Sequence, residues 1–463
     1  MNAIIFSAVW GIVMMFSGVF IKSKTIPKWL AIAGIVLLFI VNAVELNTGK
    51  PFFNYNHIDM LRISSFNLSF LAVVFACTLQ YFLLSGRDIE KVGEHVGEYF
   101  ALIFFVLCGV TLAATYNTLL LLFIGIEIIS IPLYILTGSD KRNLKSNEAA
   151  LKYFLMGAFS TGIMLMGIAF IYGGNPNASF FINNIELGTG KMPVMIAVGL
   201  VLLLVSLSFK VSAAPFHFWT PDVYDGAPTV FTSFMSTIVK VAGFFAFVRL
   251  FENAFGKVHY QWQTLIVVIT FATLFIGNIT AVFQQSVKRM LAYSSIAQAG
   301  FMLLALFALN ERAQEGLILY AAAYSLATIG LFAILIKMND YTIEGFNGLA
   351  KHQPVAALTA TIFLLSLTGI PLTAGFQSKF YMLMASVENG QNIWLVIAAV
   401  IFAAISAWYY FRIIQAMYFK PAAAVVIDAS DVGNSFKIML IISALLILIL
   451  GVYPEILIQW LYH

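Results

Sequence analysis

Charged residues and cysteine are scarce in this sequence of 463 residues. Only 10% of its residues are charged, against about 25% in an average soluble domain, and 61% are hydrophobic. Its two cysteines, Cys77 and Cys108, lie in apolar runs without CxxC or Cys/His spacing, which argues against a zinc site, an iron–sulfur cluster or a disulfide framework. The sequence also has no GxGxxG after a strand and no Walker loop, so we expect no cofactor and no metal in this chain.

Long hydrophobic runs dominate what is present, and the mean hydropathy is +0.94. Runs of about 18 to 25 apolar residues are long enough to cross a hydrocarbon core of about 30 Å, and we count about fourteen of them. Continuous runs favour helices over barrel strands, because a helix satisfies its own backbone hydrogen bonds in lipid. We therefore predict an all-α polytopic membrane protein with a single membrane domain over residues 1–463. The predicted spans are 4–21, 29–46, 66–85, 98–115, 117–137, 149–173, 193–218, 228–252, 262–283, 289–309, 314–336, 354–386, 391–418 and 436–460.

Basic residues are distributed unevenly between these spans. Lysine and arginine are concentrated in the odd-numbered loops, for example Lys141, Arg142 and Lys145 between the fifth and sixth spans. By the positive-inside rule, this bias predicts that both termini face away from the cytoplasm. The net charge of +4 follows from the same excess, so we expect a lipid bilayer and no nucleic acid as the surroundings of this chain.

Three lysines, Lys210, Lys240 and Lys379, stand deep within apolar spans, where a charge costs about 2.5–3.5 kcal/mol. Burial lowers the pKa of a lysine and a nearby carboxylate raises it again, so a lysine between these two environments can take up and release a proton near neutral pH. Arginine cannot do this, because it does not deprotonate. Glu127, within LLLLFIGIEIISIPLYIL, is the candidate carboxylate. A purely structural ion pair is the alternative for each of these residues.

Two of the spans contain helix breakers close to a deep lysine. Pro215 follows Lys210 by five residues, and Gly369 and Pro371 precede Lys379 in SLTGIPLTAGFQSKFY. Interrupted helices at matching places in two halves of a chain indicate an ion site built from inverted repeats. The alternative is that proline and glycine merely kink membrane helices, which is common.

The string HFWTPDVYDGAPT joins the spans that carry the first two deep lysines. Pro221, Gly226 and Pro228 are predicted to shape a connecting hinge. We expect His217 to be a hinge histidine bonded to the backbone, and not a proton relay. Arg249, near the end of its span, is expected to reach the headgroups or to form a local ion pair.

Four strings of this sequence closely resemble the N-type, antiporter-like membrane subunits of the proton-pumping NADH-quinone oxidoreductase, respiratory complex I. They are HFWTPDVYDGAPT, SNEAALKYFLMGAFS, QQSVKRMLAYSSIAQAGF and GIPLTAGFQSKFY. The resemblance covers nearly the whole chain. Lys379 stands where the sibling M-type subunits carry glutamate, which favours the N type.

This resemblance implies fourteen helices with two inverted repeats of five helices and discontinuous helices 7 and 12. Helices 1–3 would lie in residues 1–90, the first repeat (helices 4–8) in 98–252, the second repeat (helices 9–13) in 262–418, and helix 14 in 436–463.

The resemblance also implies roles for the deep charges. Glu127 would pair with Lys210, Lys240 would relay protons toward the cytoplasmic input, and Lys379 would relay them toward the exit. The implied activity is proton pumping, coupled to NADH oxidation and quinone reduction in partner subunits that hold NAD, FMN, iron–sulfur clusters and quinone. The implied partners are the membrane subunits of types M, K, J, A and L, in a bacterial inner membrane with both termini periplasmic. An Mrp-type cation/proton antiporter subunit and a passive scaffold are the alternatives.

Overall fold

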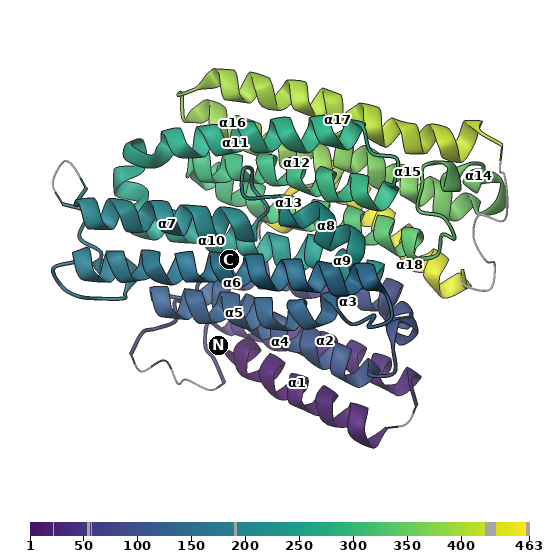
Figure 1. Cartoon of the computed structure of the whole chain (residues 1–463), viewed down its shortest axis with the longest axis horizontal. Helices are drawn as coiled ribbons and strands as arrows, with labels where there is room; N and C mark the ends of the chain where they lie inside the picture. The colour runs from purple at the N-terminus through teal and green to yellow at the C-terminus, as the bar shows by residue number, and fades with distance from the viewer. Residues whose placement is uncertain (22, 53–55, 57, 189–191, 422–431, 460–463) are drawn as a thin grey trace.

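The computed structural model describes residues 1–21, 23–52, 56, 58–188, 192–421 and 432–459, and its long helices run side by side (Figure 1). The first half of the chain forms α1 (Asn2–Phe20), α2 (Thr25–Thr48), α3 (Ser65–Val92), α4 (Val96–Thr115), α5 (Leu119–Thr137), α6 (Leu144–Gly174), α7 (Val194–Lys210), α8 (Trp219–Gly226), α9 (Thr229–Phe234) and α10 (Lys240–Phe255). The second half forms α11 (His259–Val282), α12 (Val287–Ala308), α13 (Glu311–Ile336), α14 (Leu349–His352), α15 (Pro354–Thr368), α16 (Ala374–Glu388), α17 (Ile393–Phe419), α18 (Asn434–Val452) and α19 (Glu455–Ile458).

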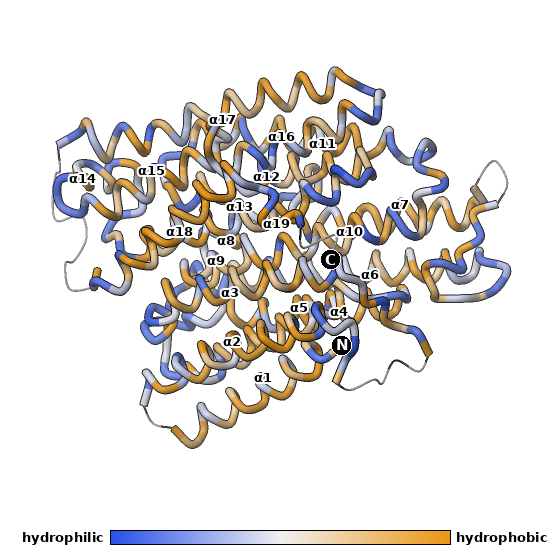
Figure 2. The backbone as a smooth tube through the Cα atoms, turned by 180° about the vertical axis from the view of Figure 1, so that it is seen from behind, coloured by the Kyte–Doolittle hydropathy of each residue, from blue (hydrophilic) through white to orange (hydrophobic). Residues whose placement is uncertain are grey.

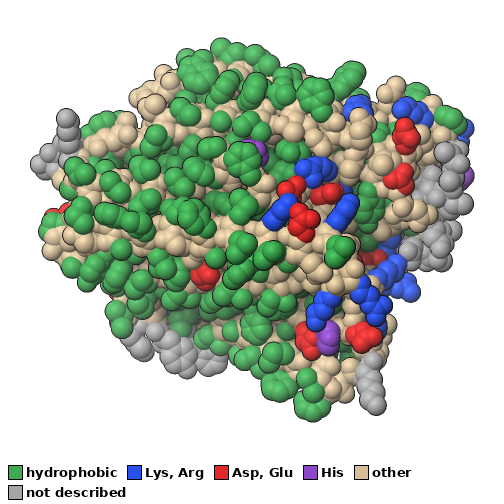
Figure 3. Space-filling view, viewed as in Figure 1, with side chains coloured by type: hydrophobic (Ala, Val, Ile, Leu, Met, Phe, Trp, Pro, Cys, Tyr) green, Lys and Arg blue, Asp and Glu red, His purple; other side chains and the backbone are tan. Residues whose placement is uncertain are grey.

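The apolar character of these helices suits a bilayer. Among the described residues, 11 helical stretches are long and apolar enough to cross a membrane, and one of them runs over Thr229–Val282. Most helices are hydrophobic along much of their length (Figure 2), and apolar side chains cover most of the left half of the face seen in Figure 3. The prediction of an all-helical, multi-pass membrane protein is confirmed.

Two helices lie at the centre of this bundle. In the most apolar 18-residue stretch of α13, every residue is buried. In the corresponding stretch of α12, nearly every residue is buried. In contrast, α1 and α2 lie along one edge of the molecule and α17 along the opposite edge (Figure 1). Polar groups on α12 and α13 are therefore shielded from lipid by the surrounding helices.

The seventh predicted span is interrupted, as expected, but at a different residue. Helix α7 ends at Lys210 itself, and Pro215 lies in the non-helical stretch 211–218, where Ser212 has φ +64°. His217 is buried in this stretch, close to the backbone of Pro215. The break thus leaves Lys210 at the carboxyl end of a helix, which favours a positive charge.

The prediction of a hinge over 221–228 is wrong for most of that stretch, because residues 219–226 form α8. Pro221 stands in the first turn of α8, where its missing N–H would have had no partner. An ideal Cβ on Gly226 would lie 2.6 Å from the carbonyl oxygen of Lys145, so this glycine allows α8 to pack against α6. Only Ala227 and Pro228 connect α8 to α9.

The break between α15 and α16 is where the sequence predicts it. Gly369 has φ +91°, a left-handed conformation that favours glycine, and Pro371 has no N–H to continue the α15 ladder. An ideal Cβ on Gly375 would lie 1.8 Å from the carbonyl oxygen of Ser366. The start of α16 can therefore pack against the end of α15 only because residue 375 has no side chain.

The predicted span 228–252 contains an irregularity that the sequence did not reveal. A π-turn, Met235–Val239, separates α9 from α10, so Lys240 is the first residue after it. Single π-turns inside helices are rare and are often found at functional sites.

Candidate functional site

Lys240 is buried at the start of α10, with 1% of its surface exposed. Its ammonium group donates hydrogen bonds to the carbonyl oxygen of Ser295, at 3.1 Å, and to the Ser295 hydroxyl. It also lies 5.8 Å from the centre of the Tyr224 ring, whose face attracts cations. The described residues give Lys240 no carboxylate partner, so dipoles alone balance its charge.

Lys379 is 5% exposed and lies beside the break between α15 and α16. Its ammonium group donates to the carbonyl oxygens of Leu367, at 2.8 Å, and Thr368, at 3.0 Å, and lies 4.5 Å from the centre of the Phe301 ring. These carbonyls belong to the last turn of α15, where the helix leaves them without intrahelical partners and its dipole is negative. The broken helix therefore supplies the binding site for the lysine.

Helix α12 connects the sites of these two lysines. Ser295 and Gln298 are three residues apart and lie on the same helix face. Ser295 accepts the hydrogen bonds of Lys240, and the Gln298 carboxamide donates at 2.9 Å to the Leu367 oxygen that also binds Lys379. One helix face and one shared carbonyl oxygen thus join Lys240 to Lys379.

The Gln298 carboxamide makes three hydrogen bonds. It accepts from the hydroxyl of Tyr320 and donates to Leu367 and, at 3.2 Å, to the hydroxyl of Tyr410. A cavity of about 10 Å³ lies between Gln298 and Lys379. This volume is close to the minimum that holds one water molecule.

Lys210, the last residue of α7, lies close to Glu127 of α5. Both are half-buried. The Lys210 ammonium donates to the Ser130 hydroxyl at 2.9 Å, and Glu127, one turn earlier in α5, accepts from the Thr161 hydroxyl at 2.7 Å. Glu127 is near enough to attract Lys210 electrostatically, although in the described residues the hydrogen bond of the lysine goes to Ser130. The direct pairing of Glu127 with Lys210 stays a prediction.

Arg249 does not reach the lipid headgroups, so the first of the two expectations for this residue is wrong, while the local ion pair stays a prediction. The residue is 5% exposed, and its guanidinium group donates to the carbonyl oxygens of Ala114 and Arg62 and stacks 4.9 Å from the centre of the Tyr116 ring. Glu252, one turn further along α10, attracts it electrostatically. The side chain turns inward because these acceptors lie inside the bundle.

A cluster of exposed charges surrounds the outer end of α8. Asp222 binds Lys152 of α6 at 3.1 Å and Arg289 of α12 at 3.2 Å, and Lys152 also binds Glu148 at 2.7 Å. A polar cavity of about 250 Å³ lies among these side chains, and charged side chains form a compact group on the face seen in Figure 3. Because Asp222 binds both α6 and α12, these ion pairs help to hold α8 against the two helices.

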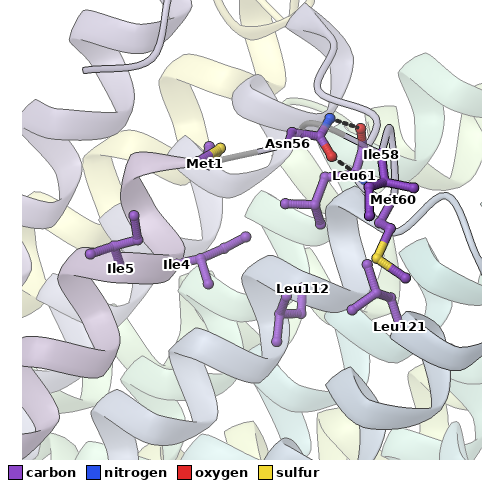
Figure 4. Close-up of a pocket in the computed structure, with 9 residues that line it drawn as sticks. All are labelled: Met1, Ile4, Ile5, Asn56, Ile58, Met60, Leu61, Leu112 and Leu121. Carbon is purple, nitrogen blue, oxygen red and sulfur yellow. Dashed lines mark hydrogen bonds between the residues drawn. The ribbon is translucent and has the colours of Figure 1, made fainter. Parts of the chain in front are cut away.

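The cavity in Figure 4, of about 320 Å³, has a different character. It lies between α1, α4, α5 and the loop before α3, and its lining is apolar except for Asn56. The Asn56 amide is already engaged with the backbone of Leu61. This lining presents no titratable side chain, so we do not include the cavity in the candidate site formed by Lys210, Lys240 and Lys379.

Sequence reasoning identified the deep charges but missed the polar residues that contact these charges or their partners. They are Ser130, Thr161, Tyr224, Ser295, Gln298, Tyr320 and Tyr324. One signal was available, because Ser295 and Gln298 stand three residues apart in an otherwise apolar span. The hydroxyls on α8 and α13 gave no such signal, since their relation to the lysines depends on tertiary packing.

Comparison with known proteins is consistent along the whole chain. Residues 117–406 match the family model described as NADH:quinone oxidoreductase/Mrp antiporter, transmembrane region. The chain is 39% identical to NADH-quinone oxidoreductase subunit N of Cytophaga hutchinsonii, over 99% of both proteins. It is 36% identical to the subunit N of Trichlorobacter lovleyi, over 98% of this chain and 94% of that one.

Solved structures agree with the sequence relatives. A chain of respiratory complex I from Thermus thermophilus is similar with a TM-score of 0.82 and 30% identity, over 99% of this chain and 98% of that one. A chain of the Mrp complex from a Dietzia species gives a TM-score of 0.85 at 18% identity, over 99% of this chain and 95% of that one, which shows a shared fold alone. The chain therefore belongs to the subunit N family of NADH-quinone oxidoreductase, the antiporter-like membrane subunits of respiratory complex I.

Proposed function

We propose that four titratable residues inside the bundle carry protons through this subunit. They are Glu127, Lys210, Lys240 and Lys379. As a member of its family, the chain is a proton-translocating membrane subunit of an NADH:quinone oxidoreductase. The observation that carries the proposal is the Leu367 carbonyl oxygen, which accepts from Lys379 and also from the helix face that holds Lys240.

The surroundings of the two deepest lysines suit a relay. An amine passes protons only if both its charged and its neutral forms can exist at the site. Lys240 and Lys379 bind carbonyl and hydroxyl oxygens, which accept from an ammonium and from a neutral amine alike. No fixed negative charge among the described residues holds the proton on either lysine. One water molecule in the small cavity beside Lys379 would carry the proton past Gln298, because an amide has no titratable proton.

Glu127 and Lys210 form the second part of the proposed relay. Their mutual attraction depends on the charge of each group, so a change in the protonation of one group changes the proton affinity of the other. We infer that charge changes in neighbouring subunits act on this pair first. NADH oxidation and quinone reduction take place in those subunits, with NAD, FMN, iron–sulfur clusters and quinone bound there. Proton movement in this chain would follow by electrostatic coupling.

The proposed architecture has fourteen spans, with α7 and α8 forming discontinuous helix 7 and α15 and α16 forming discontinuous helix 12. Residues 98–252 and 262–418 would be two inverted repeats of five helices, between an N-terminal group in 1–90 and a last helix in 436–463, of which the structure describes residues up to 459. The two interrupted helices support this assignment, since each has a lysine at its break.

The proposed setting is a bacterial inner membrane, with both termini on the periplasmic side and complex I subunits of types M, K, J, A and L as partners. Lysine and arginine side chains are more frequent at the end of the molecule where α14 and the start of α2 lie (Figures 1 and 3). That end would face the cytoplasm under the positive-inside rule.

Lysine substitutions in the assembled complex test the relay. In proteoliposomes, K240M and K379M are expected to lower the number of protons pumped per NADH oxidised, while the complex still assembles and reduces quinone. K257M, which alters an exposed lysine in the short 3-10 turn between α10 and α11, serves as the matched control. A wild-type proton yield in K240M, K379M and E127Q alike would contradict the relay and support a passive scaffold.

A further inference from the structure

Hydroxyl groups of three tyrosines from neighbouring parts of the bundle bond to the segment that carries Lys240, at three positions along it. Tyr81 donates to the Val230 carbonyl at 3.2 Å, Tyr324 to Ser236 at 2.8 Å, and Tyr116 to Ala246 at 2.9 Å. All three rings are buried. The first bond lies before the π-turn, the second lies within it, and the third lies after it.

The π-turn decides which way Lys240 points. A π-turn contains one residue more than an α-turn, and successive residues of an α-helix are about 100° apart around the axis. If 235–239 were α-helical, every residue after it would be rotated by about 100° relative to α9. Lys240, the first residue after the turn, would then no longer point at Ser295.

Tyr324 binds a carbonyl oxygen that the π-turn leaves without its α-helical partner. In a regular α-helix, the Ser236 carbonyl would accept from the Lys240 N–H. Here that N–H donates to Thr237, and the Ser236 carbonyl accepts from the Tyr324 hydroxyl. Tyr224 also reaches the turn, but through a longer bond of 3.4 Å to the Met235 carbonyl.

We propose that Tyr324 is a positioning residue, whose hydroxyl stabilises the π-turn against the α-helical form and so aims Lys240 at Ser295. The inference rests on the proposed function, in which Lys240 relays protons. Tyr324 suits this role because it stands on α13, the most completely buried of the long helices that the structure describes, and is itself 3% exposed. It fixes the turn against a rigid neighbour.

Tyrosine-to-phenylalanine variants of the assembled complex separate this role from ordinary packing. Y324F is expected to lower the proton-pumping rate in proteoliposomes several-fold with quinone reduction retained. Y81F and Y116F remove one buried hydroxyl bond each from the same segment and are expected to pump as the wild type does. Equal pumping by all three variants would overturn the proposal.

Moving the lysine from position 240 to position 239 tests the positioning role of Tyr324 directly. If loss of the Tyr324 hydroxyl lets the turn become α-helical, residue 239 takes the direction that residue 240 had. The double variant V239K/K240V should then pump poorly with Tyr324 intact and regain pumping when Y324F is added. Full pumping by V239K/K240V alone, or no recovery in the triple variant, would overturn the positioning role.

The relay itself has its own readout. K240M must lose pumping if Lys240 is a relay at all, and normal pumping by K240M would contradict the proposed function directly. Loss of pumping in K240M together with normal pumping in Y324F would contradict only the positioning role of Tyr324.

Discussion

Lys379 and Gln298 donate hydrogen bonds to the same atom, the carbonyl oxygen of Leu367, at 2.8 and 2.9 Å. The lysine comes from α16, the glutamine from α12 and the carbonyl from the last turn of α15. The oxygen is available because α15 stops at the following residue, so its last carbonyls lack helical partners. The helix break thus brings an ammonium group and the α12 polar face to one acceptor.

A carboxylate at position 298 should slow the relay. Residue 298 lies close to Lys379, since both side chains bond to the Leu367 carbonyl oxygen. In Q298E the new carboxylate would attract the Lys379 ammonium, so the lysine would hold its proton more firmly. We expect the variant complex to assemble and to pump at a reduced rate in proteoliposomes. The control is Q80E, because Gln80 is a buried glutamine with its own bonds to Leu326 and Ser443, away from the lysines. Equal pumping rates in the two variants would contradict the prediction.

Arginine should not replace Lys379, although it keeps the positive charge. Its guanidinium can still donate to the α15 carbonyls, but it does not release its proton near neutral pH. K379R is therefore expected to lose pumping to the same extent as K379M, measured as protons per NADH oxidised. Pumping by K379R at the wild-type level would mean that the charge of residue 379 matters and its proton does not.

Removing Asp88 from its buried ion pair with Lys337 should destabilise the protein. The paired atoms are 2.5 Å apart and both side chains are buried, and the Lys337 ammonium lies 5.6 Å from the centre of the Phe436 ring. Removing one partner of a buried pair leaves an uncompensated charge, which costs about 3–5 kcal/mol. D88A should therefore lower the thermal unfolding temperature of the assembled complex markedly.

The double variant D88L/K337M is the informative control for this pair. Replacing both charges with apolar side chains of similar size removes the buried charge altogether, and such replacements are often neutral. We expect D88L/K337M to be more stable than D88A. A double variant that is as unstable as D88A would show that packing around these residues, and not their charge, sets the stability.

A methyl group at position 375 should disrupt the break that holds Lys379. The Cβ of G375A would overlap the Ser366 carbonyl oxygen, which is backbone and cannot rotate away. We expect poor assembly, or an assembled complex with reduced pumping. G162A is the matched control, because a Cβ there meets nothing within 4 Å and alanine favours a helix over glycine by up to about 1 kcal/mol. Normal pumping by G375A would show that α15 and α16 can separate without affecting Lys379.

The sequence indicated the breaks but not their limits. Gly369 and Pro371 mark the second break directly, since each opposes helix by its own backbone. The first break begins at Lys210, before the nearest proline, and α8 forms across a stretch that looked like a hinge. Proline is compatible with a first helical turn, so its presence alone could not distinguish a hinge from a helix start.

The sequence by itself determined that the chain is a helical membrane protein with three lysines in apolar segments. Hydrophobic run length and the cost of a charge in lipid are local properties, so they can be read along the chain. Only the tertiary structure decided how Lys240 and Lys379 are connected. Ser295, Gln298 and the Leu367 carbonyl lie far from one or both lysines in sequence and meet them through the packing of α12 against α10 and α16. The direction in which Lys240 points likewise depends on a π-turn that is bonded to a tyrosine of another helix.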